Sequence, residues 1–177
     1  ILAADLYIER EDKPDKPYRM TFYAKDLKGY RNLTELVSSG FTENQHHDKA
    51  QILKQWFKEK GEGLIGLSGF NNGDIGTALL SGKEDEAEQH LEFWLSVLPN
   101  RFYLELQRTD RKVDERLVQK TLLLADKKQV PVVATNDVRF IKEDDFYAHE
   151  ARVCIGEGST LDDPRRERRY SEQQYFK

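Results

Sequence analysis

The sequence predicts a single domain of the α/β class, and three observations carry this prediction. Apolar stretches that end at turn residues alternate with segments of helical periodicity, which is the pattern of repeated βα units. The length of 177 residues suits one domain with a sizeable core. Hydrophobic residues make up 38% and charged residues 34% of the chain, which predicts a heavily charged surface, and the chain is too rich in Tyr, Phe and Leu for a disordered protein.

The first half of the chain supplies two strands, two helices and a third strand. Residues 2–9 form the first predicted strand, and residues 19–24 form the second after a turn that contains two prolines. Apolar side chains at helical spacing predict helices over residues 27–37 and 50–58. A short apolar run bounded by glycines predicts a strand over residues 63–68.

The second half continues the alternation. A helix is predicted to begin near Asp74, after a turn rich in glycine and asparagine. Apolar spacing predicts a helix over 85–98, ended by the following proline. Residues 102–107 alternate as a strand does, and residues 114–128 have strong helical periodicity.

An unbroken apolar run begins at Val130 and leads directly to Asp137. In sheets and barrels of parallel strands, functional groups collect where strands end, so this carboxylate lies where a metal ligand or catalytic residue is expected. A helix over 143–154 follows, and residues 156–177 have no clear periodicity.

Charge and cysteine content exclude several classes of protein. The 28 Lys and Arg residues are outnumbered by 32 Asp and Glu residues, so no global basic field attracts nucleic acid. Cys154 is the single cysteine, which excludes an internal disulfide and is typical of a reducing cytosol. Apolar runs are much shorter than the roughly 20 residues that span a bilayer, so we expect no membrane partner.

Three carboxylates are candidates for one site. Asp5, Glu105 and Asp137 fall on predicted strands or at their ends, where they can converge on one mouth. Oxygen ligands alone are typical of Mg²⁺. Arg139 follows Asp137 at the position where a metal-binding D-x-H pair has its histidine, and a guanidinium has no lone pair to donate to a metal.

The histidines are poor metal-site candidates by spacing. His46 and His47 are adjacent and lack the i, i+4 spacing that brings two imidazoles to one ion, so we predict a solvated surface pair. His149 lies one turn after Asp145, and we predict a structural role for it. The turn over residues 69–73 matches no nucleotide-binding motif.

Several segments together resemble the PHP (polymerase and histidinol phosphatase) domain of bacterial replicative DNA polymerase III alpha subunits. These segments cover nearly the whole chain: residues 29–33 (GYRNL), 67–69 (LSG) with 73–74 (GD), 102–108 (FYLELQR), 131–140 (PVVATNDVRF), 148–150 (AHE), 160–164 (TLDDP), 170–171 (YS) and 173–175 (QQY).

The resemblance implies a distorted, TIM-like, seven-stranded β/α barrel whose strand ends can hold a cluster of metal ions. Active members bind these ions with an N-terminal H-x-H motif, further His and acidic residues, a Cys in an S-G-C turn, and a closing D-x-H pair. Here we expect a partial PHP domain over residues 1–155 that lacks the first strands and the H-x-H motif. Residues 156–177 are then an exit segment toward the polymerase body.

Position by position, the resemblance implies a degenerate metal site. Asp5 and Asp137 stand where active members have acidic metal ligands. Met20 replaces a His, Phe70 replaces the turn Cys, and Arg139 replaces the final His. We therefore expect no catalytic residue and no metal in this segment, with Arg139 paired to Asp137 or Asp5. Glu105 and His149 are possible supporting residues.

The expected function is that of a non-catalytic scaffold within a DNA-directed DNA polymerase of the bacterial cytoplasm. The resemblance implies docking of a separate proofreading exonuclease subunit, contact with the other polymerase domains of the same chain, and DNA bound through the parent protein. No cofactor is expected here, because Mg²⁺ acts in the palm domain of the parent. One alternative is a metal-dependent phosphoesterase or 3′-5′ exonuclease that uses Asp5, Glu105 and Asp137. Another is DNA binding through the arginine-rich run at residues 165–169.

Overall fold

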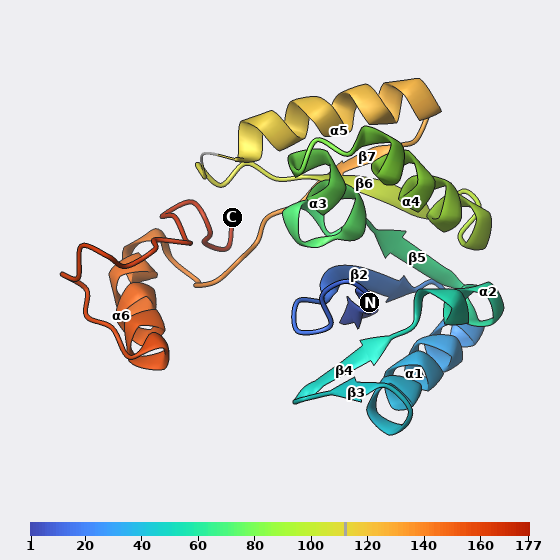
Figure 1. The fold of residues 1–177 in the computed structure, drawn as a ribbon, viewed down its shortest axis with the longest axis horizontal. Helices are drawn as coiled ribbons and strands as arrows, with labels where there is room; N and C mark the ends of the chain where they lie inside the picture. Colours follow the sequence, from blue (N-terminus) through green and yellow to red (C-terminus); the bar gives the residue numbers. More distant parts are fainter. Residues whose placement is uncertain (112) are drawn as a thin grey trace.

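The computed structural model describes residues 1–111 and 113–177 and contains a seven-stranded sheet with helices packed around it (Figure 1). The strands are β1 (Leu2–Ile8), β2 (Tyr18–Ala24), β3 (Gln45–His46), β4 (Lys49–Ile52), β5 (Leu64–Leu67), β6 (Phe102–Leu106) and β7 (Val132–Ala134).

The sheet has the strand order β3-β4-β1-β2-β5-β6-β7. Parallel pairs join β1 to β4, β5 to β6 and β6 to β7, whereas β2 runs antiparallel to both of its neighbours. Within the described residues the sheet is open, with β3 and β7 at its two edges. The predicted α/β class is confirmed, and the open seven-stranded sheet is consistent with a distorted PHP barrel.

The helices are α1 (Leu27–Thr42), α2 (Phe57–Lys60), α3 (Asp74–Leu80), α4 (Glu84–Val97), α5 (Asp114–Lys128) and α6 (Phe146–Glu157), with short 3₁₀ turns η1 (Lys54–Trp56), η2 (Phe70–Asn72) and η3 (Glu143–Asp145). The Asp26 carboxylate caps α1 by accepting a 2.9 Å hydrogen bond from the Gly29 backbone N–H. None of the helices in residues 1–111 and 113–177 has the length and apolar character needed to cross a membrane.

An aromatic core lies between one face of the sheet and helices α2 and α4. Trp94 of α4 stacks on Phe102 of β6, with ring centroids 5.7 Å apart, and Phe22 of β2 packs on Phe57 of α2 at 4.6 Å. Met20 is fully buried in the same core. Successive side chains of a strand point to opposite faces, so Arg19, Thr21 and Tyr23 of β2 face away from this core.

The prediction of a helix over residues 50–58 is wrong in its first half. Lys49–Ile52 form β4, which pairs in parallel with β1 through Ile8 and Ile52, and helical turns begin only at Lys54. The spacing of the apolar residues near Trp56 fits a helix, but the free energy of pairing with β1 decides the structure of the segment before it. In a short apolar run, periodicity alone does not distinguish a strand from a helix.

Helix α6 lies to one side of the sheet together with the C-terminal segment (Figure 1). This segment returns to the chain that follows β7. The Arg139 N–H donates to the Gln174 carbonyl at 2.8 Å, and the Phe176 N–H donates to the Phe140 carbonyl at 3.1 Å. The last residues therefore pack beside Asp137.

Candidate functional site

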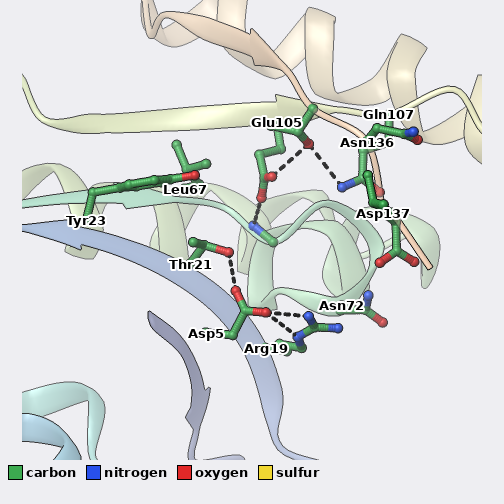
Figure 2. A pocket seen from close by; sticks show the side chains of 13 residues that line it. Asp5, Arg19, Thr21, Tyr23, Leu67, Asn72, Glu105, Gln107, Asn136 and Asp137 are labelled. Carbon is green, nitrogen blue, oxygen red and sulfur yellow. Dashed lines mark hydrogen bonds and ion pairs between the residues drawn. The ribbon is translucent and has the colours of Figure 1, made fainter. Parts of the chain in front are cut away.

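A polar cavity of about 300 Å³ opens on the face of the sheet that points away from the aromatic core (Figure 2). Strands β1, β2, β5 and β6 and the segments after β5, β6 and β7 supply its walls. The residues that line it are Asp5, Arg19, Thr21, Tyr23, Leu67, Gly69, Asn72, Glu105, Gln107, Thr135, Asn136, Asp137 and Val138.

The three carboxylates expected at one mouth all line this cavity. Asp5 lies opposite Thr21 in the β1–β2 ladder, and Thr21 lies opposite Leu67 in the β2–β5 ladder, which places Asp5 on the same face as the end of β5. Glu105 points to this face because Phe102 and Leu104 of the same strand point into the core. Asp137 follows the end of β7.

Asp5 is held by two side chains of β2. Thr21 Oγ1 donates to Asp5 Oδ1 at 2.6 Å, and Arg19 Nε donates to Asp5 Oδ2 at 3.1 Å, with a second bond from Arg19 Nη2 to the same oxygen. Burial alone would raise the pKa of Asp5, but the hydrogen bonds from Thr21 and Arg19 outweigh burial and hold the pKa below its usual value. Asp5 is therefore ionised and paired.

Glu105 lies deeper and has no cationic hydrogen-bond partner among the described residues. Its carboxylate accepts hydrogen bonds from the Gly69 backbone N–H at 2.5 Å and from Thr135 Oγ1 at 2.8 Å. Burial raises the pKa of Glu105 despite these two hydrogen bonds. Gly69 is required at this turn, because its φ is +73° and a Cβ there would lie 2.1 Å from the Arg19 carbonyl oxygen.

Asp137 is held from the side of the C-terminal segment. Arg139 Nη2 lies 2.8 Å from Asp137 Oδ1 and donates to Oδ2 at 3.0 Å, and Gln174 Nε2 donates to Oδ2 at 2.9 Å. The Arg139 guanidinium lies 5.3 Å from the centre of the Tyr170 ring and is absent from the cavity wall. Arg139 thus pairs with Asp137, whereas the guanidinium inside the cavity, beside Asp5, is that of Arg19.

Two of the positions that the resemblance assigns to the metal site, Met20 and Phe70, do not line the cavity. Both side chains are buried in the core, Met20 at 0% and Phe70 at 2% exposure, so neither faces the cavity. Arg19, one residue before Met20, points into the cavity because adjacent residues of a strand face opposite sides. The alternation of buried Met20 and Phe22 is the signal in the sequence from which Arg19 and Thr21 could have been identified.

His149 lies in α6 and is not part of the cavity wall. Its buried ring packs 5.4 Å from the Phe140 ring and 4.8 Å from the Tyr170 ring. The predicted structural role agrees with this packing. Gln174 is the residue that sequence reasoning missed on this side, and no local pattern marks it.

The residues of the cavity do not fit a cluster of divalent cations. Among the described residues that line it there is no histidine or cysteine, and Arg19 occupies the space beside Asp5. Each carboxylate already accepts hydrogen bonds from arginine, threonine, glutamine or backbone donors. A guanidinium stays protonated and cannot ligate a metal, so it competes with a cation for these oxygens. The arrangement is suited to holding strand ends together through ion pairs.

Comparison with known proteins identifies relatives along the whole chain. Residues 1–109 match the PHP domain family. The DNA polymerase III subunit alpha of Pseudomonas aeruginosa is 51% identical over 177 residues, that of Pasteurella multocida 45%, and that of Escherichia coli K12 41%. Each alignment covers 100% of this chain but 15% of the relative, so the chain spans about one seventh of the length of these relatives.

Proposed function

Because the chain belongs to the PHP domain family of DNA polymerase III alpha subunits, we propose that it is a non-catalytic scaffold and interaction domain of a replicative DNA polymerase. In this proposal the protein that carries the segment is a DNA-directed DNA polymerase of the bacterial cytoplasm. Its nucleotidyl transfer uses Mg²⁺ in another domain, and DNA contacts belong to that larger protein.

One observation carries the proposal, namely the pairing of Arg19 with Asp5 inside the cavity. A cationic side chain at this position repels a divalent ion and satisfies the carboxylate that would otherwise bind it. Asp137 is satisfied in the same way by Arg139. In this proposal the carboxylates stabilise the scaffold through ion pairs and hydrogen bonds and do not ligate a metal.

The proposed partners are a separate proofreading exonuclease subunit and the remaining polymerase domains of the same chain. The exonuclease partner rests on the resemblance to alpha subunits whose metal site is degenerate. A direct test mixes the full-length alpha subunit with that exonuclease subunit at micromolar concentration and follows both by gel filtration. We expect co-elution, and separate elution would contradict the docking role.

A second candidate function is a metal-dependent phosphoesterase or 3′-5′ exonuclease. The observation in its favour is the gathering of Asp5, Glu105 and Asp137 around one cavity, since oxygen ligands are those that Mg²⁺ prefers. DNA binding through the 165–169 run is less favoured, because the Arg166 guanidinium is already bound to the buried Glu150 carboxylate at 2.7 Å.

The two functions are separated by comparing the full-length protein with its Asp5→Asn/Asp137→Asn variant. The scaffold proposal predicts that both bind the same number of metal ions and that neither hydrolyses phosphodiesters with added Mg²⁺ or Mn²⁺. Polymerase activity of both preparations controls for integrity. Hydrolysis that the double substitution abolishes, with polymerase activity retained, would establish the phosphoesterase instead.

A further inference from the structure

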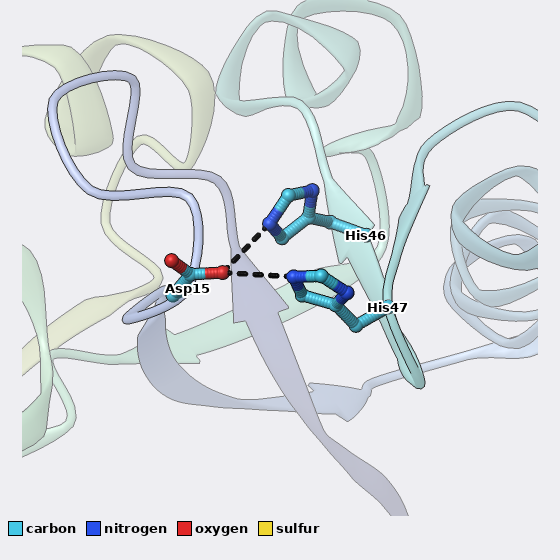
Figure 3. Close-up of side chains that lie close together, drawn as sticks. All are labelled: Asp15, His46 and His47. Carbon is cyan, nitrogen blue, oxygen red and sulfur yellow. Dashed lines mark hydrogen bonds and ion pairs between the residues drawn. The ribbon is translucent and has the colours of Figure 1, made fainter.

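Two histidines and an aspartate meet at the edge of the sheet far from β7 (Figure 3). His46 Nε2 lies 2.8 Å and His47 Nε2 lies 3.1 Å from the same oxygen, Asp15 Oδ1. The three ligand atoms all lie within 4.8 Å of one another. The spacing argument against a shared ion is therefore wrong for this pair, because both imidazoles lie beside the same carboxylate oxygen.

The backbone of a tight hairpin brings the two imidazoles to one side. His46 is the last residue of β3, and His47 begins the turn to β4 with a φ of +50°. This left-handed conformation breaks the alternation of a strand, so the two ring centroids lie only 4.3 Å apart. The two Nε2 atoms are therefore presented to the same side of the hairpin.

The loop between β1 and β2 presents Asp15 to this pair. The buried side chain of Gln51 in β4 donates from Nε2 to the Pro14 carbonyl at 2.7 Å, and Lys49 Nζ donates to the Asp15 carbonyl at 3.4 Å. Both anchors belong to the hairpin that carries the histidines. The carboxylate is therefore positioned by the same β3–β4 hairpin that carries the imidazoles.

We propose that Asp15, His46 and His47 form a binding site for a divalent transition-metal ion of the zinc class. Two imidazole nitrogens and one carboxylate oxygen are a ligand set that Zn²⁺ uses, with a water in the fourth position. Ligands about 2.1 Å from a tetrahedral ion lie roughly 3.4 Å from one another, so shifts of these exposed side chains by an ångström or less complete the geometry.

Metal binding requires the lone pair on each Nε2 that now lies beside the carboxylate. In the metal-free protein at least one Nε2–H donates to Asp15 Oδ1, and each neutral ring frees its lone pair by carrying its proton on Nδ1. The ion then replaces the hydrogen bonds and links the β1–β2 loop to the β3–β4 hairpin. The site shares no residue with the cavity of Figure 2.

Zinc binding to the full-length protein without an affinity tag, measured by calorimetric titration, tests the site. We expect one Zn²⁺ more per chain than in the Asp15→Asn, His46→Ala and His47→Ala variants, or binding at this site weakened at least tenfold in each. Asp12→Asn is the matched control, because Asp12 lies in the same loop, is exposed and pairs with Arg10 outside the cluster.

Cobalt substitution supplies a second readout that depends on the ligands. Co²⁺ in the wild-type protein should give the visible d–d bands of a tetrahedral nitrogen and oxygen site, and each of the three variants should lose them. Circular dichroism in the presence of a chelator verifies that the variants remain folded. Equal zinc stoichiometry and affinity in the wild type and all three variants would overturn the proposal, as would loss of the site in Asp12→Asn.

Discussion

At the residue scale, two neighbouring carboxylates in one cavity ionise differently because their surroundings differ. Asp5 has a guanidinium and a hydroxyl as donors, which lower its pKa, whereas Glu105 is nearly fully buried and has only neutral donors. Burial is the dominant influence on Glu105, and the negative charge of Asp5 adds to it, so its pKa is raised. Glu105 is thus the group whose ionisation costs the fold stability.

The first prediction concerns the pH dependence of stability in Glu105→Gln. A carboxyl with a raised folded-state pKa binds more protons in the folded than in the unfolded state, so its contribution is fully present below the unfolded value of 4.5. That contribution is lost as pH rises through the folded pKa. Urea denaturation at a series of pH values from 4.5 upward should show a fall in the wild-type free energy of unfolding that the variant lacks.

The control for this prediction is Glu115→Gln, because Glu115 is an exposed glutamate and its pKa is lowered by hydrogen bonds from Gln119 and Arg108. Its removal should leave the fall in stability in place. A wild-type slope that persists in the Glu105 variant would show that another group causes it.

At the element scale, the strands and long helices were predictable because their periodicity is strong. The helix over 114–128 is observed with those bounds, and the alternation in residues 102–107 placed Glu105 opposite the core. The error at Met20 is a one-residue register error, which in a strand moves a side chain to the other face of the sheet. No local signal distinguishes such a shift until the burial of Met20 and Phe22 is considered together.

The β3–β4 hairpin was missed because β3 has only two residues and β4 is defined by its pairing with β1. The same long-range pairing explains why Asp15 was not considered with the histidines. Asp15 lies 31 positions before His46 in the chain, and its approach to the two adjacent histidines depends on tertiary structure.

The second prediction concerns Gln51, which fastens the β1–β2 loop to β4. Gln51 is 1% exposed and donates to the Pro14 carbonyl of the exposed loop, so Gln51→Ala removes this hydrogen bond together with the packing of a buried side chain. We expect a loss of about 1–2 kcal/mol in the free energy of unfolding. The exposed Gln55→Ala serves as control and should change stability by less than about 0.5 kcal/mol. Equal effects in urea denaturation would mean that Gln51 does not fasten the loop.

At the scale of the whole molecule, the C-terminal segment is joined to the sheet through the residues after β7. Gln174 is fully buried, and it contacts Asp137 through its side chain and Arg139 through its carbonyl. The sequence of residues 156–177 has no periodicity from which this contact could be predicted. The contact joins Gln174 to Asp137, 37 positions earlier in the chain, which no local pattern reveals.

The third prediction is that Arg139→Ala weakens this junction. The guanidinium pairs with Asp137, whose side chain is 13% exposed, and lies over the Tyr170 ring. Its loss leaves a largely buried carboxylate with fewer donors, so we expect a decrease of about 1–2 kcal/mol in the free energy of unfolding, more than for an exposed ion pair. The amide of residue 139, which donates to the Gln174 carbonyl, should also exchange faster with solvent.

Arg165→Ala is the matched control, because the Arg165 side chain is 89% exposed and pairs only locally with Asp163. It should lower stability by less than about 0.5 kcal/mol and leave exchange at residue 139 unchanged. Urea denaturation and amide exchange on both variants separate two interpretations of Arg139. If the two variants unfold at the same urea concentration, Arg139 is a surface residue in energetic terms, and the junction between the sheet and the C-terminal segment depends on its other hydrogen bonds, such as those of Gln174 and Asn136.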